Sequence, residues 1–231
     1  MMLEVRDLAV GYNQKNVLHG VSLDVDKAQI VALVGHNGAG KTTLMRSALG
    51  LTQCNAGSVV FDGQAVVSGR VAQTVARGLS FVPQGHNTFR SLKVAENLDI
   101  AVNAAGPGAA ARVDEVFAMF PILRERLAQP AGKLSGGQQQ MVALALALVR
   151  GPRMIMLDEP STGLSPVLVD EVFSRVVEMR ERFGISVLIV DQNVRRLLGI
   201  VDRVAVLKAG HKVFDGPPAS ITNDEKLWQL F

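Results

Sequence analysis

The stretch that most constrains the fold is IVALVGHNGAGKTTLM, residues 30–45, where an apolar run leads through a glycine-rich loop into a helical pattern. Uninterrupted apolar residues predict a strand covered on both faces, as in the centre of a parallel sheet. Residues 35–42 match G-x-x-x-x-G-K-[ST], and glycines let such a loop turn its N–H groups inward on an anion. The segment therefore predicts a phosphate-binding loop between a buried strand and a helix.

Two side chains of this loop add to the backbone cradle. Lys41 supplies a point charge for the β- and γ-phosphate oxygens of a nucleotide, and the Thr42 hydroxyl is placed to bind Mg²⁺. The residues that we expect to contact the nucleotide here are Gly35, His36, Asn37, Gly38, Ala39, Gly40, Lys41, Thr42 and Thr43.

Polar residues also follow two other apolar runs. RMIMLDEP predicts a buried strand that delivers Asp158 at its carboxyl end, where sheets of this kind hold their ligands. Asp158 can hold Mg²⁺, and Glu159 can polarise an attacking water. In SFVPQGHN, Gln84 follows a strand end, where its amide can bind the metal or hold water. Each would be an ordinary turn residue in isolation, but beside a phosphate loop they predict a hydrolytic site.

Strand and helix patterns alternate along the chain, which predicts a mostly parallel α/β sheet. Residues 85–140 contain helical patches without a convincing strand, and we interpret them as a helical lobe. We expect a single domain, with an α/β core formed by residues 1–84 and 141–231. The predicted strands are residues 3–10, 21–25, 30–34, 58–61, 79–82, 154–157, 186–190, 203–207 and 211–216, and the predicted helices are residues 41–50, 112–119, 138–149 and 167–183.

Composition narrows the classes of protein. The longest apolar run, MVALALALV, is far shorter than the ~20 residues that span a bilayer, and the charged N-terminal sequence is not a signal peptide. Cys54 is the only cysteine, so an internal disulfide is impossible and a reducing compartment fits. A net charge of +3 without long basic runs argues against a nucleic-acid surface. We expect a soluble intracellular protein that reaches a membrane only through a partner.

A second anion site is indicated by KLSGGQQQ, residues 133–140, where a hydroxyl and two glycines precede an apolar helix. Free N–H groups and the positive end of the helix dipole converge at such a corner. Alone, the pattern would be read as a Ser/Gly helix cap. Residues 135–137 include no cation, so they cannot hold a free nucleotide strongly. Hydrogen bonds to a charged group still contribute about 1.5–3 kcal/mol each.

The chain resembles the ATP-binding-cassette ATPases over essentially its whole length. The motifs that carry the resemblance are LSGGQ, the phosphate loop, the Asp158–Glu159 strand end and Gln84. The resemblance implies a P-loop NTPase fold with a mostly parallel sheet, an N-terminal antiparallel β subdomain and an inserted helical subdomain. It implies ATP and Mg²⁺ as cofactors. It also implies a head-to-tail dimer in which one protomer's corner caps the γ-phosphate held by the other protomer. The corner residues are Ser135, Gly136, Gly137 and Gln138.

The same resemblance assigns further residues. Tyr12 occupies the place of the aromatic that stacks on adenine, and Val17 lies near the ring. STGLS, residues 161–165, matches the loop that crosses to the opposite subunit, with Ser165 where the family commonly has Asp. Gln192 stands where many members have a histidine that touches the γ-phosphate. We predict that Gln192 senses this phosphate, without the ability to titrate near neutral pH.

Four segments resemble the shorter ATPase subunit of branched-chain amino-acid importers and their urea or amide relatives. They are VPQG, STGLSP, DQN and the C-terminal VFDGPPASITNDEKLWQLF. This implies two transmembrane permease subunits, a second ATPase subunit that is identical or different, and a solute-binding protein that acts indirectly. The chain would lie in the cytoplasm, peripheral on the inner face of the membrane, and would contact neither solute nor nucleic acid. Phe89 and Leu92 are either permease contacts or core residues.

Other functions remain open at this point. One is the ATPase of an exporter, for example of lipopolysaccharide, although a histidine at position 192 would be more typical there. Another is a soluble cassette ATPase of DNA repair or translation, which usually carries two cassettes, coiled coils or zinc motifs. A phosphotransferase would leave LSGGQ unexplained.

Overall fold

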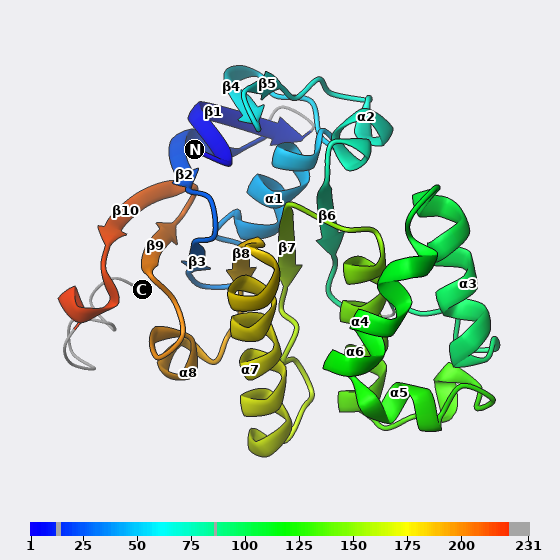
Figure 1. Cartoon of the computed structure of the whole chain (residues 1–231). Helices are drawn as coiled ribbons and strands as arrows, with labels where there is room; N and C mark the ends of the chain where they lie inside the picture. The colour runs from blue at the N-terminus through cyan, green and yellow to red at the C-terminus, as the bar shows by residue number, and fades with distance from the viewer. Residues whose placement is uncertain (13–14, 86, 222–231) are drawn as a thin grey trace.

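The computed structural model describes residues 1–12, 15–85 and 87–221. Within these ranges the chain forms two sheets, a set of helices around them, and a helical lobe to one side (Figure 1). The end of the C-terminal segment VFDGPPASITNDEKLWQLF, residues 222–231, lies outside the described part, as do residues 13, 14 and 86.

The larger sheet has six strands in the order β10-β9-β3-β8-β7-β6. Neighbouring strands from β9 to β6 pair in parallel, and only β10 is antiparallel to its neighbour. This confirms the predicted mostly parallel sheet. The strands are β3 (Ile30–Val34), β6 (Leu79–Val82), β7 (Met154–Asp158), β8 (Ser186–Val190), β9 (Arg203–Lys208) and β10 (His211–Gly216).

The smaller sheet is the antiparallel subdomain that the family resemblance implied, with strand order β2-β1-β4-β5. Its second strand begins at Lys15 and not at Val21 as predicted, because the ladder to β1 continues through the polar residues as far as the Tyr12–Lys15 pair. Ladder hydrogen bonds come from the backbone and need no apolar pattern. The strands are β1 (Leu3–Tyr12), β2 (Lys15–Val25), β4 (Ala56–Phe61) and β5 (Gln64–Ala65).

Helices cover the sheets and form the lobe. In the lobe, α3, α4 and α5 pack against α6, and the described residues between 85 and 135 contain an isolated bridge from Lys93 to Pro130 but no strand. α6 continues past residue 140 and leads to β7, so it connects the lobe to the larger sheet. The helices are α1 (Lys41–Leu49), α2 (Val71–Ala76), α3 (Val94–Ala105), α4 (Val113–Met119), α5 (Pro121–Glu125), α6 (Gly136–Val149), α7 (Pro166–Phe183) and α8 (Val194–Leu198).

The larger sheet is buried on both faces, which explains its uninterrupted apolar runs. Side chains of β3 alternate between two apolar clusters. Ile30, Ala32 and Val34 join the cluster that contains α6, α7 and the lobe helices. Val31 and Leu33 join the cluster under α1 and the antiparallel sheet. Among the described residues, no helix combines the length and the apolar character that crossing a bilayer requires.

Candidate functional site

The predicted phosphate loop lies between β3 and α1, and two of its glycines are required by close contacts. A Cβ atom added at Gly35 would lie 2.2 Å from the carbonyl oxygen of Leu207. One added at Gly40, whose φ is +106°, would lie 2.6 Å from Leu18 Cδ2. Neighbouring backbone and core side chains therefore enclose the loop, and the first turn of α1 faces the space inside it.

Lys41, the first residue of α1, is buried at this loop. Its Nζ donates hydrogen bonds to the carbonyl oxygens of Gly35, at 2.6 Å, and His36, at 2.9 Å. Burial lowers the pKa of the Lys41 ammonium below its usual value, while the charges of Glu159 and Asp158 raise it. An anion inside the loop would therefore compensate a cation that is partly removed from water.

Thr42 and Asp158 form the part of the site that fits a magnesium ion. The Thr42 hydroxyl donates to Asp158 Oδ2 at 2.9 Å, and Asp158 is only 4% exposed. Burial raises the pKa of Asp158 above its usual value, and the Thr42 hydrogen bond opposes this rise. One hydroxyl and one carboxylate are oxygen ligands of the kind that Mg²⁺ uses together with substrate phosphates. The described residues contain no cluster of three or more His, Cys, Asp or Glu side chains that would form an all-protein metal site.

Glu159 follows β7 and is held in place through both its backbone and its carboxylate. Its φ of +50° is unusual for a residue with a side chain, and its N–H donates to the Val190 carbonyl oxygen at 2.8 Å. Its Oε2 accepts hydrogen bonds from Gln84 Nε2 at 2.7 Å, Gln192 Nε2 at 2.9 Å and Thr162 Oγ1 at 3.0 Å. The three side chains that we predicted to be catalytic are thus in direct contact.

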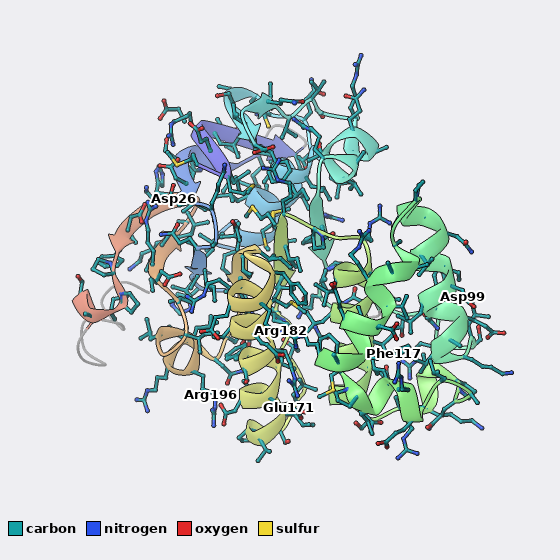
Figure 2. All side chains as sticks on the ribbon, viewed as in Figure 1. Asp26, Asp99, Phe117, Glu171, Arg182 and Arg196 are labelled. Atoms are coloured by element: carbon teal, nitrogen blue, oxygen red, sulfur yellow. The ribbon has the colours of Figure 1, made fainter. Side chains whose placement is uncertain are left out.

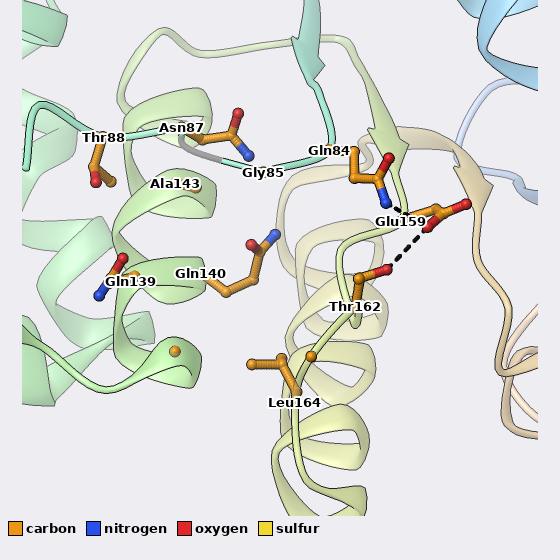
Figure 3. A pocket seen from close by; sticks show the side chains of 12 residues that line it. Gln84, Gly85, Asn87, Thr88, Gln139, Gln140, Ala143, Glu159, Thr162 and Leu164 are labelled. Carbon is orange, nitrogen blue, oxygen red and sulfur yellow. Dashed lines mark hydrogen bonds between the residues drawn. The ribbon is translucent and has the colours of Figure 1, made fainter. Parts of the chain in front are cut away.

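A cleft of about 460 Å³ opens beside this carboxylate, between the loops after β6 and β7 and the first turns of α6. Figure 3 shows Gln84 and Thr162 pointing at Glu159 on one side, with Gln139 and Gln140 on the opposite, α6 side. The lobe helix and the residues that we predicted to be catalytic therefore share one cleft.

The predicted corner, residues 135–138 (called the SGG corner below), caps α6. Ser135 Oγ accepts a hydrogen bond from Gln138 N at 3.3 Å, and Gln138 Oε1 accepts one from Ser135 N at 3.2 Å, which is a capping box. This explains why α6 begins at Gly136 and not at residue 138 as predicted. A Cβ atom on Gly137 would lie 2.8 Å from Leu168 Cδ2, so α7 packs directly on this corner. No hydrogen bond between described residues joins the corner to the phosphate loop of the same chain.

Of the two predicted adenine contacts, Val17 lies beside the phosphate loop, whereas Tyr12 contacts Thr52. A Cβ atom at Gly40 would lie 3.4 Å from the Val17 carbonyl oxygen, so β2 flanks the phosphate loop. Tyr12 lies at the end of β1, 44% exposed, with its hydroxyl 3.3 Å from Thr52 Oγ1. The described contacts do not link Tyr12 to the loop, and its stacking on adenine stays a prediction.

Sequence reasoning missed several residues at the site. Thr162, the third donor to Glu159, lies in the STGLS segment, and its hydroxyl three residues after a carboxylate was the available signal. Leu168 and its contact with Gly137 left no local signal. Asp191 and Ser161, which form a buried hydrogen bond beside Gln192, were also missed as a pair.

Three curated relatives resemble the chain along nearly its full length. LivF of Archaeoglobus fulgidus, a probable branched-chain amino acid transport ATP-binding protein, is 37% identical, covering 99% of this chain and 98% of the relative. BraG of Pseudomonas aeruginosa, a high-affinity branched-chain amino acid transport ATP-binding protein, is 35% identical, covering 98% and 97%. LptB of Haemophilus influenzae, a lipopolysaccharide export system ATP-binding protein, is 34% identical, covering 100% and 96%.

Solved structures and a family model agree with these relatives. CbiO1 of Clostridium perfringens, part of the ABC transporter complex cbiONQ, has a TM-score of 0.88 and 27% identity, covering 99% of this chain and 93% of the other. A dimeric post-hydrolysis structure of the cassette MJ0796 with ADP and Pi has a TM-score of 0.81 at 22% identity, covering 94% and 99%, and shows the shared fold. The family model described as ABC transporter matches residues 18–162, more than half of the chain. The chain therefore belongs to the ABC transporter family and is one of its ATP-binding ATPase subunits.

Proposed function

We propose that this ATPase subunit drives the import of branched-chain amino acids or related polar solutes. The observation that carries the hydrolytic part of the proposal is that Gln84 and Gln192 both donate to Glu159 Oε2, next in sequence to the Asp158 that Thr42 contacts. LivF and BraG are branched-chain amino acid transport proteins by name, which supports the solute class. LptB supports a lipopolysaccharide exporter as the second candidate, at slightly lower identity.

Hydrolysis follows from the roles that these residues take around bound ATP. Lys41 exchanges its two carbonyl acceptors for phosphate oxygens. Thr42, Asp158 and Gln84 would hold Mg²⁺, which would supply positive charge to offset that of the phosphates. The three described donors to Glu159 all reach Oε2, and none reaches Oε1, so Oε1 orients the attacking water. Gln192, whose amide donates to Glu159, senses the γ-phosphate in this proposal.

Closure of a dimer completes the site. The corner at residues 135–138 of one protomer caps the γ-phosphate in the other protomer's phosphate loop, and hydrolysis then removes this bridge. Ser135 and Gly136 are exposed and lie at a helix N-terminus, which favours an anion by up to about 2 kcal/mol in a partly buried setting. The cassette MJ0796, which shares the fold, is dimeric with ADP and Pi bound, and this supports a nucleotide-bound dimer.

The helical lobe docks on the permease subunits at the cytoplasmic face of the membrane. Phe89 is 55% exposed, whereas Leu92 is half-buried, so Phe89 is the stronger candidate contact. A groove of about 390 Å³ nearby is lined by apolar side chains that include Phe81 and Leu146. A second ATPase subunit, identical or different, completes the complex, and a solute-binding protein acts on the permease. The chain itself contacts neither solute nor nucleic acid.

Phosphate release from MgATP by the full-length chain tests the hydrolytic assignment. Glu159→Gln keeps the side-chain volume and an oxygen that can accept the same three hydrogen bonds. Because it cannot act as a base, we expect a loss of about 10²–10⁴-fold in kcat with ATP binding retained. A wild-type rate in this variant would refute the role of Glu159.

The dimer is tested in the Glu159→Gln background by size-exclusion chromatography with MgATP. We expect a dimer that Ser135→Ala shifts towards monomer, whereas Ser91→Ala, at another exposed serine of the lobe, leaves it intact. Equal behaviour of the two serine variants would contradict capping by Ser135.

Membrane coupling is tested by pull-down of the permease subunits and by uptake of radiolabelled leucine into vesicles that contain the complex. We expect Phe89→Ala to weaken the pull-down, and Ile100→Ala, which removes another exposed apolar side chain of the lobe, to leave it unchanged. Uptake that does not depend on ATP and Glu159 would contradict the proposed function.

A further inference from the structure

Asp191 is a buried carboxylate directly after β8, only 3% exposed, and it accepts four hydrogen bonds. Ser161 donates its backbone N–H to Oδ2 at 3.0 Å and its hydroxyl to Oδ1 at 2.6 Å. Asn193 donates its backbone N–H to Oδ1 at 2.9 Å and its Nδ2 to the same oxygen at 3.2 Å. The Asn193 amide also donates to Ser161 Oγ at 2.6 Å, which closes a three-residue network.

This network joins the two loops that carry Glu159 and Gln192. Ser161 lies two residues after Glu159 and is itself 2% exposed, and Asp191 directly precedes Gln192. On the other side, the Glu159 N–H bonds to the Val190 carbonyl oxygen at 2.8 Å. The contact from Gln192 to Glu159 is therefore held between a backbone hydrogen bond and a buried carboxylate network. A left-handed residue such as Glu159 persists only where its surroundings fix it.

We propose that Asp191 is a positioning residue for ATP hydrolysis, which acts through Gln192 and fixes its amide on the carboxylate of Glu159. The inference rests on the proposed hydrolytic roles of Glu159 and Gln192. Asp191 lies outside the phosphate loop, and its hydrogen-bond partners Ser161 and Asn193 are not among the residues that we predict to contact the nucleotide. Its loss therefore lowers the rate of the chemical step and leaves nucleotide affinity unchanged.

The chemistry of the network requires a carboxylate. All four groups that reach Asp191 are donors, and an ionised carboxylate is acceptor-only. The amide of an asparagine would turn an NH₂ group towards at least one N–H or O–H donor. Buried donors that lose their acceptor are costly, so the loops must shift to relieve the conflict. Such a shift moves Gln192 relative to Glu159.

The main experiment measures steady-state MgATP hydrolysis by the full-length chain. We expect Asp191→Asn to lower kcat by about tenfold or more, while KM stays within about twofold. Asp191→Glu restores an acceptor-only group and should recover part of the loss. A kcat within twofold of wild type, or a rise in KM that accounts for the loss, would overturn the proposal.

Combination with Gln192→Ala separates positioning from general structural damage. If Asp191 acts through Gln192, then Asp191→Asn adds less than about a twofold loss of kcat to the Gln192→Ala variant. Losses that multiply would show that Asp191 acts by another route and would overturn the proposal. Glu159→Gln separates the two levels of inference, because a fully active Glu159→Gln refutes the proposed function, and an inactive one beside an active Asp191→Asn refutes this inference alone.

Ser161, in the loop after β7, and Ser186, at the start of β8, provide a matched pair of variants. This pair also tests the proposal if Asp191→Asn does not fold. Ser186 is fully buried at the start of β8, where its Oγ accepts the Ala28 N–H at 2.9 Å. Ser161→Ala should lower kcat by about threefold or more, and Ser186→Ala should leave it within twofold. Equal effects of the two variants on kcat would overturn the proposal.

Discussion

Replacing Asp158 with asparagine should stabilise the nucleotide-free chain while weakening its response to MgATP. Asp158 is buried, and its hydrogen bond in the described structure comes from Thr42. Asparagine has nearly the same volume and can accept this bond through Oδ1. The substitution therefore removes a buried charge without creating a cavity or an unpaired hydroxyl, although the new amide NH₂ needs an acceptor of its own, which keeps the gain small.

The size of the effect follows from the cost of a buried charge with too few partners. An under-bonded buried polar group costs about 1–3 kcal/mol, and more when charged. The attraction of Lys41 for Asp158 offsets part of this cost. We expect a net gain of about 1 kcal/mol, which corresponds to a rise in Tm of about 2–4 °C for a chain of this size.

The pH dependence of Tm separately tests whether Asp158→Asn raises or lowers stability. Burial raises the pKa of Asp158 above its ordinary value of 3.8 in the folded chain. Above that value the unfolded chain binds fewer protons at this position than the folded chain does. Asp158 therefore lowers stability as pH rises through the pKa of the folded chain. The Tm difference between Asp158→Asn and wild type should be absent below about pH 3.8 and should widen as pH rises.

The assay is thermal unfolding from acid to neutral pH, with and without MgATP. A ligand at 100 times its Kd stabilises a protein by about 2.7 kcal/mol, and Asp158→Asn should lose most of this response. Asp202→Asn is the control, because Asp202 is exposed and accepts hydrogen bonds from Arg180 and from the Ile30 N–H, so its loss should not raise Tm. An unchanged or lower Tm for Asp158→Asn at neutral pH, or a difference that narrows with pH, would refute the reasoning.

Further predictions concern the SGG corner, the Gln192 position and an ion pair of the C-terminal hairpin. Gly137→Val should destabilise the chain by about 1–3 kcal/mol in urea unfolding because its side chain meets Leu168, and Leu168→Ala in the same chain should recover part of the loss. Gln192→His should introduce an inflection near pH 6.5 in the hydrolysis rate, and an identical profile would exclude contact with the reacting groups. Arg203 and Lys212 lower the pKa of Asp215 against the effect of burial, so Asp215→Asn should lose stability at neutral pH, with the difference fading as pH falls below about 3.8.

Local sequence patterns predicted the strands of the parallel sheet and the phosphate loop, because each of these features is encoded within a few consecutive residues. Predictions were weaker at the ends of elements, which are set by backbone ladder hydrogen bonds or by helix caps. β2 continues to Lys15 through polar residues, and α6 begins at Gly136 because Ser135 caps it. Contacts between distant segments, such as Leu168 on Gly137, left no pattern that a single sequence reveals.

The position of the three side chains that we propose for hydrolysis follows from strand order. β7 lies between β6 and β8, and all three strands run parallel, so their carboxyl ends reach the same edge of the sheet. Gln84 and Gln192 each follow the last residue of their strand by two positions, and Glu159 follows its own by one. The in-register pairs Val82–Leu157 and Asp158–Val190 keep these ends level.

This geometry explains why Glu159 receives an amide from each side, and a different buried side chain fixes the loop that carries each amide. The loop after β6 leads into the helical lobe, where Asn97 fixes its next part through hydrogen bonds with the backbone of Phe89 and Lys93. The loop after β8 leads only to the short helix α8, so Asp191 provides the fixed point there. Because Asn97 and Asp191 fix different loops, substitutions at these two positions should affect hydrolysis independently of each other.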